Sequence, residues 1–279
     1  MRLLRVVAAL GALAAGTAGC GGGGATQWRF SADAGVRIRD AVSTEALRGT
    51  DGSILVYANT LTGIEGYRSG DGLSLRRVAG RMPLGGHPTV VALPDGRLRM
   101  YYATPADLPF HPSQLRSAIS RDGVFWFLED GVRFGDVGFG VMEIVRLPDG
   151  TWRLYFNDRR LDGSSRVLSA RSTRGLTYHR ERGVRLPAPY VDPAVVRVGP
   201  RGWLMAVATL EHGRRQRIFL AESRNGVDWR VDAKPIVSDS DASVFDPTLL
   251  PLGGGRFRLY YTRSQGKRFE VLSGVLGRT

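Results

Sequence analysis

The chain has 279 residues, of which 43% are hydrophobic and 23% charged, and this composition excludes a disordered or coiled-coil protein. With 39 basic against 26 acidic residues its net charge is +13, but the basic residues are scattered and form no run, so we expect no nucleic-acid partner. The 37 glycines and 14 prolines, without a collagen period, indicate many short elements joined by tight turns.

Residues 1–19 are predicted to be an export signal. Arg2 and Arg5 precede an apolar run, and no other apolar run reaches the roughly 18 residues that a membrane-spanning helix needs. Cys20, the single cysteine, follows small residues and resembles the lipidated cysteine of a bacterial lipoprotein. The alternative is a plain secretory signal in which Cys20 is incidental. We therefore expect an exported protein, held in the cell envelope only by a lipid on Cys20, or secreted if that cysteine is not modified.

Residues 20–26 are glycine-rich and read as a flexible tether, and residues 27–279 form the folded body. Within the body one phrase recurs: a two-residue turn followed by an alternating, aromatic-rich strand, with a short apolar strand before the turn. The copies are DGSILVYANT from Asp51, DGRLRMYYAT from Asp95, DGTWRLYFND from Asp149, RGWLMAVAT from Arg201 and GGRFRLYYTR from Gly254.

A second phrase follows the first in four of the units and reads as the turn between a third and a fourth strand. Its copies are SGDGLSL from Ser69, SRDGVFW from Ser120, STRGLTY from Ser172 and SRNGVDW from Ser223. Serine and aspartate can bond the backbone of their own loop there, and glycine allows a positive φ. Four strands in about fifty residues is the pattern of a β-propeller blade. The fold class is therefore all-β, a five-bladed propeller with four-stranded blades.

The last unit, from Phe245, ends where its outer strand should begin. The segment QWRFSADAGVRI, from Gln27 to Ile38, matches the outer strand and exit of the second unit, FWFLEDGVRF from Phe125. We infer that this N-terminal strand completes the last blade. Closing the ring in this way removes the exposed sheet edges of an open array.

Each unit brings one titratable side chain to the start of its inner strand, where the strands converge on the axis of the ring. Alignment by the turns gives Glu45, His87, Glu143, Asp192 and Asp246. Carboxyl groups crowded near the axis raise one another's pKa. A protonated acid beside an ionised carboxylate is what the cleavage of a glycosidic bond requires.

The five blades, the Asp-Pro pairs at Asp192 and Asp246, and the S-x-D-G-x-x-W turns resemble the glycosidase-type propellers of arabinanases, xylosidases, invertases and levansucrases. The turns also resemble sialidase Asp-boxes, with one residue fewer between Asp and Gly. The arabinanase-like pattern implies an Asp base in the first blade, an Asp that tunes the acid in the third and a Glu acid in the fourth. This chain has Glu45 or Asp40, then Glu143, then Asp192, so the Asp and Glu identities differ.

We predict Glu143 as the acid and Asp40 or Glu45 as the base, with Asp192 tuning the pair. The alternative for the Asp-Pro pairs is structural, since Asp can bond backbone amides and Pro can start a strand. The predicted substrate-binding residues are His87, Asp246, Asn157, Asp158, Arg159 and His111.

Two functions fit these residues. The first is a glycoside hydrolase-like enzyme acting on a polysaccharide or other glycan, and the second is a non-catalytic propeller that binds glycan or protein in the same funnel. We expect a monomer without a cofactor. Four scattered histidines lack the spacing of a zinc site, while a calcium ion on the axis stays an open alternative.

Overall fold

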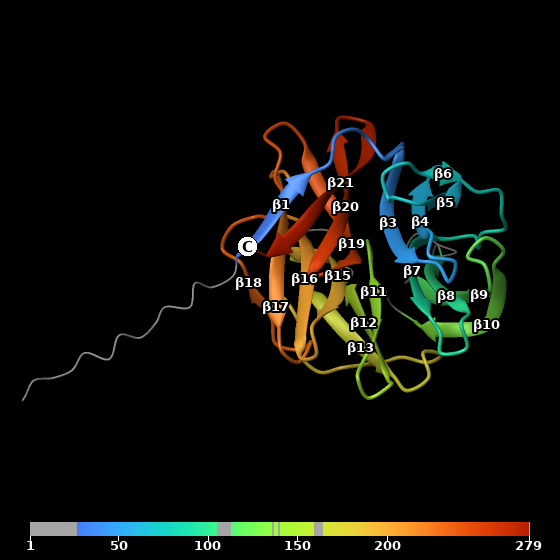
Figure 1. Cartoon of the computed structure of the whole chain (residues 1–279). Helices are drawn as coiled ribbons and strands as arrows, with labels where there is room; N and C mark the ends of the chain where they lie inside the picture. Colours follow the sequence, from blue (N-terminus) through green and yellow to red (C-terminus); the bar gives the residue numbers. More distant parts are fainter. Residues whose placement is uncertain (1–26, 105–112, 136, 139, 159–163, 279) are drawn as a thin grey trace, which may run out of the picture.

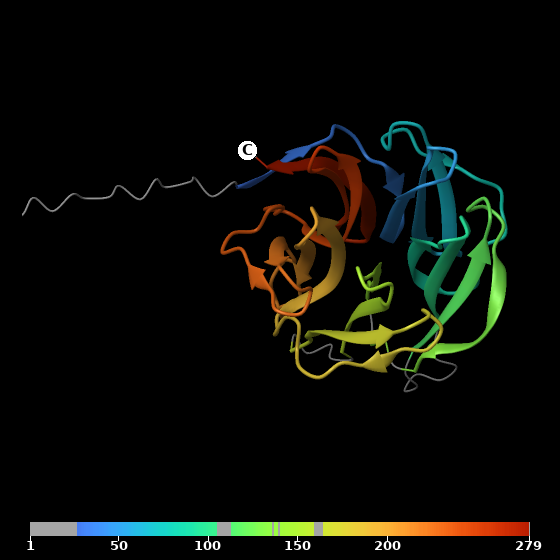
Figure 2. The ribbon, with the colours of Figure 1, turned by 60° about the horizontal axis from the view of Figure 1, so that its bottom comes forward.

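The protein is described by a computed structural model that covers residues 27–104, 113–135, 137–138, 140–158 and 164–278. Over these ranges the chain forms β-strands and no helix. Its antiparallel sheets are arranged in a ring, which Figures 1 and 2 show from two directions. The predicted five-bladed propeller is confirmed. In the described ranges no helix is long and apolar enough to cross a membrane.

The first four blades each have four strands in chain order from the axis outward. Blade one consists of β3 (Ala41–Arg48), β4 (Ile54–Thr60), β5 (Gly63–Ser69) and β6 (Arg76–Arg77). Blade two consists of β7 (Gly86–Ala92), β8 (Leu98–Thr104), β9 (Gln114–Ser120) and β10 (Phe127–Phe134). Blade three consists of β11 (Glu143–Arg146), β12 (Trp152–Asn157), β13 (Val167–Ser172) and β14 (His179–Arg180). Blade four consists of β15 (Tyr190–Val198), β16 (Gly202–Thr209), β17 (Ile218–Ser223) and β18 (Arg230–Val231).

Blade five joins the two ends of the chain. It consists of β19 (Ser243–Gly253), β20 (Arg256–Gln265), β21 (Arg268–Arg278), β1 (Trp28–Ala32) and β2 (Ile38–Arg39). The N-terminal β1 is antiparallel to β21, with Trp28 opposite Arg278, and the two strands lie side by side in Figure 1. The predicted closure of the last blade by the N-terminal strand is therefore confirmed.

A tyrosine on the second strand of a blade contacts the serine-glycine turn of the following blade. In each case the phenol donates a hydrogen bond to the glycine carbonyl. The four pairs are Tyr57 to Gly123 at 2.7 Å, Tyr101 to Gly175 at 2.8 Å, Tyr155 to Gly226 at 2.7 Å and Tyr260 to Gly72 at 2.7 Å. The predicted turn thus also links neighbouring blades.

The joint between blades four and five differs from the other four. Ala206 pairs with Ala194 as Tyr57 pairs with Glu45, so blade four has no tyrosine at this position. Instead, the indole of Trp28 donates to Glu222 of blade four at 2.9 Å. The N-terminal strand therefore supplies both the outer sheet partner of blade five and a hydrogen bond across this joint.

The strand registers give the ring two distinct ends. In blade one Ile54 pairs with both Arg48 and Ser69, so the first and third turns lie together. Ala41 pairs with Thr60 at the opposite end of the sheet. We call the first side the turn end and the second side, where the inner strands begin, the funnel end.

Candidate functional site

A cavity of about 540 Å³ opens at the funnel end and lies on the axis of the ring. Its polar lining comes from Asp40, Ser43, Asn59, Thr60, His87, Asp192, Gln216 and Asp246. Its apolar lining comes mainly from Val42, Leu61, Val191, Leu210, Phe245 and Phe269. The volume falls within the roughly 300–1,000 Å³ of small-molecule sites, and the mixture of apolar walls with a few polar groups is typical of them.

Local backbone geometry aims the polar side chains at the axis. Ser43, His87, Asp192 and Asp246 stand at equivalent bulges of their inner strands, with φ values of 50°, 51°, 56° and 49°. Such values are uncommon outside glycine, and strained residues of this kind cluster at functional sites. A bulge inserts an extra residue that leaves the ladder and re-aims a side chain. The regular two-residue alternation of a strand would not have predicted this geometry.

One half of the polar lining is a chain of hydrogen bonds across three blades. The backbone amide and the hydroxyl of Ser43 both donate to Oδ2 of Asp246 at 2.9 Å. The Ser43 hydroxyl also lies 3.0 Å from Nδ1 of His87. Burial lowers the pKa of His87, although the charge of Asp246 acts in the opposite direction. We therefore treat His87 as a neutral imidazole at neutral pH.

The other half of the lining centres on Asp192. Its Oδ1 accepts from the Val141 backbone amide and from the Asn157 side chain, both at 3.1 Å. Burial raises the pKa of Asp192 well above its usual range, and the charge of Asp246, which it contacts, raises that pKa further. Burial also raises the pKa of Asp246, against opposing contributions from His87 and Ser43. Two like charges in contact cannot both ionise easily, so the pair tends to keep one proton.

Glu45 and Glu143 lie deeper along the axis and are absent from the described residues that line the cavity. Glu143 accepts from the Thr89 hydroxyl at 3.0 Å and from the Val195 amide at 3.4 Å. Burial raises the pKa of Glu143 to about 7. Glu45 accepts from Thr248 at 3.1 Å, and burial together with the charge of Glu143 raises its pKa. Glu45 also accepts from the Val90 amide at 3.4 Å, so each glutamate ties its own blade to both neighbours.

The remaining predicted site residues are dispersed. Asp40 lines the cavity, is solvent-exposed and has a φ of 52°. Asn157 reaches the site through its bond to Asp192, whereas Asp158 forms an ion pair with Arg166 at 2.8 Å and does not line the cavity. His111, Arg159 and Cys20, together with the predicted signal (1–19) and tether (20–26), lie outside the described residues.

Several lining residues were not among the predicted site residues. Ser43 is the one that the sequence could have identified most readily, because its position aligns with those of His87, Asp192 and Asp246. Asn59, Gln216 and Phe269 come from the second and third strands and their loops, where the repeat carries no constant residue. The described residues contain no group of three or more His, Cys, Asp or Glu side chains placed to hold a metal ion.

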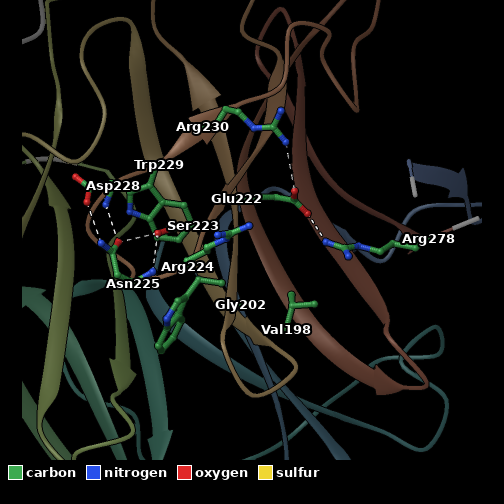
Figure 3. A pocket seen from close by; sticks show the side chains of 11 residues that line it. Val198, Gly202, Glu222, Ser223, Arg224, Asn225, Asp228, Trp229, Arg230 and Arg278 are labelled. Atoms are coloured by element: carbon green, nitrogen blue, oxygen red, sulfur yellow. Dashed lines mark hydrogen bonds and ion pairs between the residues drawn. The ribbon is translucent and has the colours of Figure 1, made fainter. Parts of the chain in front are cut away.

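A second concavity, of about 660 Å³, lies at the turn end beside Trp203 and Trp229 of blade four (Figure 3). Its central carboxylate, Glu222, contacts Arg230 at 3.8 Å and is also paired with Arg278 of blade five. Figure 3 shows Glu222 between the two arginines. Because these charges pair with one another across the last joint, we assign this concavity to ring closure and take the funnel cavity as the functional site.

No protein-family model matches the sequence, and no curated protein matches it. Solved structures do match the fold. A thermostable family-43 glycoside hydrolase aligns with a TM-score of 0.70 and 13% identity over 89% of this chain and 95% of that one. An endo-arabinase from Bacteroides thetaiotaomicron aligns with a TM-score of 0.66 and 13% identity over 88% and 94%. An endo-1,4-beta-xylanase from the same organism aligns with a TM-score of 0.63 and 12% identity over 89% and 97%. At these identities the likeness shows that this chain shares the propeller fold of these proteins.

Proposed function

We propose that this chain is an exported carbohydrate-active protein that binds a glycan in the funnel cavity. The observation that carries the proposal is the lining itself. Apolar walls that suit the carbon face of a sugar surround carboxyl, amide and imidazole groups that suit its hydroxyls. The fold shared with glycoside hydrolases supports a glycan as the ligand.

Cleavage of the bound glycan is a second candidate, favoured by one arrangement. Asp192, whose raised pKa keeps a proton available, and the exposed Asp40 line the same cavity. A protonated carboxylic acid and a separate carboxylate are the two groups of glycoside hydrolysis. Glu143 and Glu45 would then not touch the sugar. Their carboxyl groups, which lie beneath the site, would influence the ionisation of the groups that line it.

A glycan array followed by a turnover assay tests both candidates. Wild type is compared with Asp192→Asn and Glu143→Gln, and with the exposed Asp241→Asn as a control outside the cavity. If Asp192→Asn loses binding and the other variants keep it, the glycan binds in the funnel. If wild type cleaves the glycan and a variant still binds it without cleaving it, the protein is an enzyme. Binding without turnover in every variant leaves a glycan-binding module, and the absence of binding by wild type rejects the proposal.

We further propose that the protein is anchored by a lipid on Cys20, as its likeness to a lipoprotein signal suggests. In a bacterial host, wild type is expected in the membrane fraction and Cys20→Ala in the soluble exported fraction. An unchanged distribution would contradict the anchor without touching the glycan site.

A further inference from the structure

The funnel cavity carries the opposite charge to the rest of the molecule. Three carboxyl groups, on Asp40, Asp192 and Asp246, line it, and the described lining residues include no lysine or arginine. The whole chain has 39 basic residues and a net charge of +13. Among the described residues, a lining with three carboxyl groups and no lysine or arginine, in a chain this basic, disfavours anionic ligands and favours cationic ones.

Apart from the contact between the two groups, each buried carboxyl group of the pair is held through one oxygen. Oδ1 of Asp192 accepts from Val141 and Asn157, and Oδ2 of Asp246 accepts twice from Ser43. The second oxygens, Oδ2 of Asp192 and Oδ1 of Asp246, receive no hydrogen bond from another donor among the described residues, and the two groups contact each other. Both residues are 95% buried and face the cavity.

We propose that this pair of carboxyl groups recognises a primary ammonium group, and that the ligand is an amino sugar with a free amine. This inference rests on the proposed glycan binding, and it replaces the acid role of Asp192, because both carboxyl groups are ionised when the amine is bound. An ammonium carries three donors and no acceptor, so one group can bond both second oxygens and still donate to a third acceptor. Charge-assisted bonds of this kind are about twice as strong as neutral ones.

The rest of the lining favours a sugar over a flexible cationic chain. Asn59, Thr60 and Gln216 offer donors and acceptors for ring hydroxyls, while Phe245 and Phe269 offer aromatic surface. A uronic acid would place its carboxylate among Asp40, Asp192 and Asp246, which costs free energy through like-charge repulsion. The site therefore distinguishes the free amine from both an acetylated amine and an acidic sugar.

Binding of the ammonium is coupled to a proton. The free pair holds one proton, and a bound cation makes two ionised carboxylates favourable, so that proton leaves. The other groups around the pair are Ser43 and the exposed Asp40 beside β3, neutral His87 on β7 and Asn157 on β12, with Glu45 and Glu143 below. Affinity is thus expected to rise with pH, by up to about tenfold per unit, until the free pair has lost its proton or the amine loses its own.

Calorimetry on the full chain tests the proposal with a β-1,4-linked glucosamine tetramer and its fully N-acetylated counterpart. Titrations in two buffers of different ionisation enthalpy count the protons released. The glucosamine tetramer is expected to bind at least tenfold tighter than the acetylated one and to release about one proton per site. Equal affinity for the two tetramers, or the absence of proton release, would overturn the inference.

The variant Asp246→Asn keeps an oxygen for Ser43 and a donor for Asp192 but removes the shared proton. It is expected to bind the glucosamine tetramer at least tenfold more weakly and to release no proton, whereas Asp232→Asn, outside the cavity, behaves as wild type. If Asp246→Asn fails to fold, the proton count on wild type still decides. If only the acetylated tetramer binds, recognition of a free amine is rejected and the glycan-binding function stands. If a lysine peptide binds and neither tetramer does, both the amino-sugar ligand and the glycan-binding function are rejected.

Discussion

The two deepest acidic residues, Glu45 and Glu143, form the floor of the site and not its lining. Each accepts hydrogen bonds from a threonine and a backbone amide of neighbouring blades, and together they connect all five inner strands. The sequence predicted that both residues face the axis, because strand alternation gives the direction of a side chain. It could not predict their depth, which depends on where the loops and bulges above them end.

Buried Glu143 makes the stability of the fold dependent on pH. Its pKa is about 7 in the folded chain and about 4.3 in an unfolded one. The folded state therefore keeps a proton that the unfolded state loses, and this contribution to stability declines as pH rises from about 4.3 to 7. The free energy of unfolding of wild type should therefore fall between pH 5 and pH 8. In Glu143→Gln this fall should be smaller by about 1 to 3 kcal/mol, as measured by urea unfolding at the two pH values.

Glu181 is the matched control, because its surroundings shift its pKa in the opposite direction, downward. It accepts two bonds from Arg153, at 2.8 and 3.0 Å, and one from Ser169, and these contacts lower its pKa despite partial burial. The stability that it contributes is present above the unfolded pKa and declines as pH falls. Glu181→Gln should therefore weaken the fold at both pH values, and an identical response of the two variants would contradict this assignment.

At the scale of the elements, the contact that recurs at four of the five joints between blades is the tyrosine-to-turn bond. Tyr155→Phe removes the donor to the Gly226 carbonyl and should lower the free energy of unfolding by about 0.5 to 1.5 kcal/mol. Gly226→Ala should cost more, because its φ is 69° and a Cβ would lie 2.8 Å from the Tyr155 hydroxyl. Chemical denaturation measures both, with Tyr190→Phe as the control. A Tyr155→Phe variant as stable as wild type would show that the bond is not a source of stability.

The blades were predictable from the sequence and the inner-strand bulges were not. The turn phrases recur at nearly constant spacing because each blade repeats one geometry: in the second blade Ser120 accepts from the Gly123 amide at 2.9 Å and Asp122 from the Val124 amide at 2.8 Å. The bulges at Asp192 and Asp246 change which side chains reach the cavity, yet they leave no spacing signal. Asn157, predicted to bind sugar, donates its side-chain amide to Oδ1 of Asp192 and accepts from the Asp192 backbone amide, both at 3.1 Å, a contact that the sequence did not predict.

At the scale of the whole molecule, ring closure depends on Trp28. This residue is 6% exposed, lies 5.9 Å from Phe257 between ring centroids and donates to Glu222. Trp28→Ala leaves a cavity at the last joint and should lower the free energy of unfolding by about 3 to 5 kcal/mol. Denaturation of Arg29→Ala, an exposed neighbour on the same strand, gives the control. Equal stability of the two variants would mean that closure does not require the indole.

The position of Trp28 also sets the end of the ring to which an anchor on Cys20 would be joined. Trp28 pairs with Arg278 at the turn end, whereas Phe269 at the other end of β21 lines the cavity. Nine residues of strand at about 3.3 Å each place these ends roughly 30 Å apart. A lipid on Cys20 would therefore be attached at the end of the ring opposite the funnel. Coupling Cys20, the single cysteine, to maleimide-lipid vesicles should change glycan affinity by less than about twofold. A tenfold loss on tethering, with unmodified Cys20→Ala mixed with the same vesicles as the control, would mean that the funnel faces the bilayer.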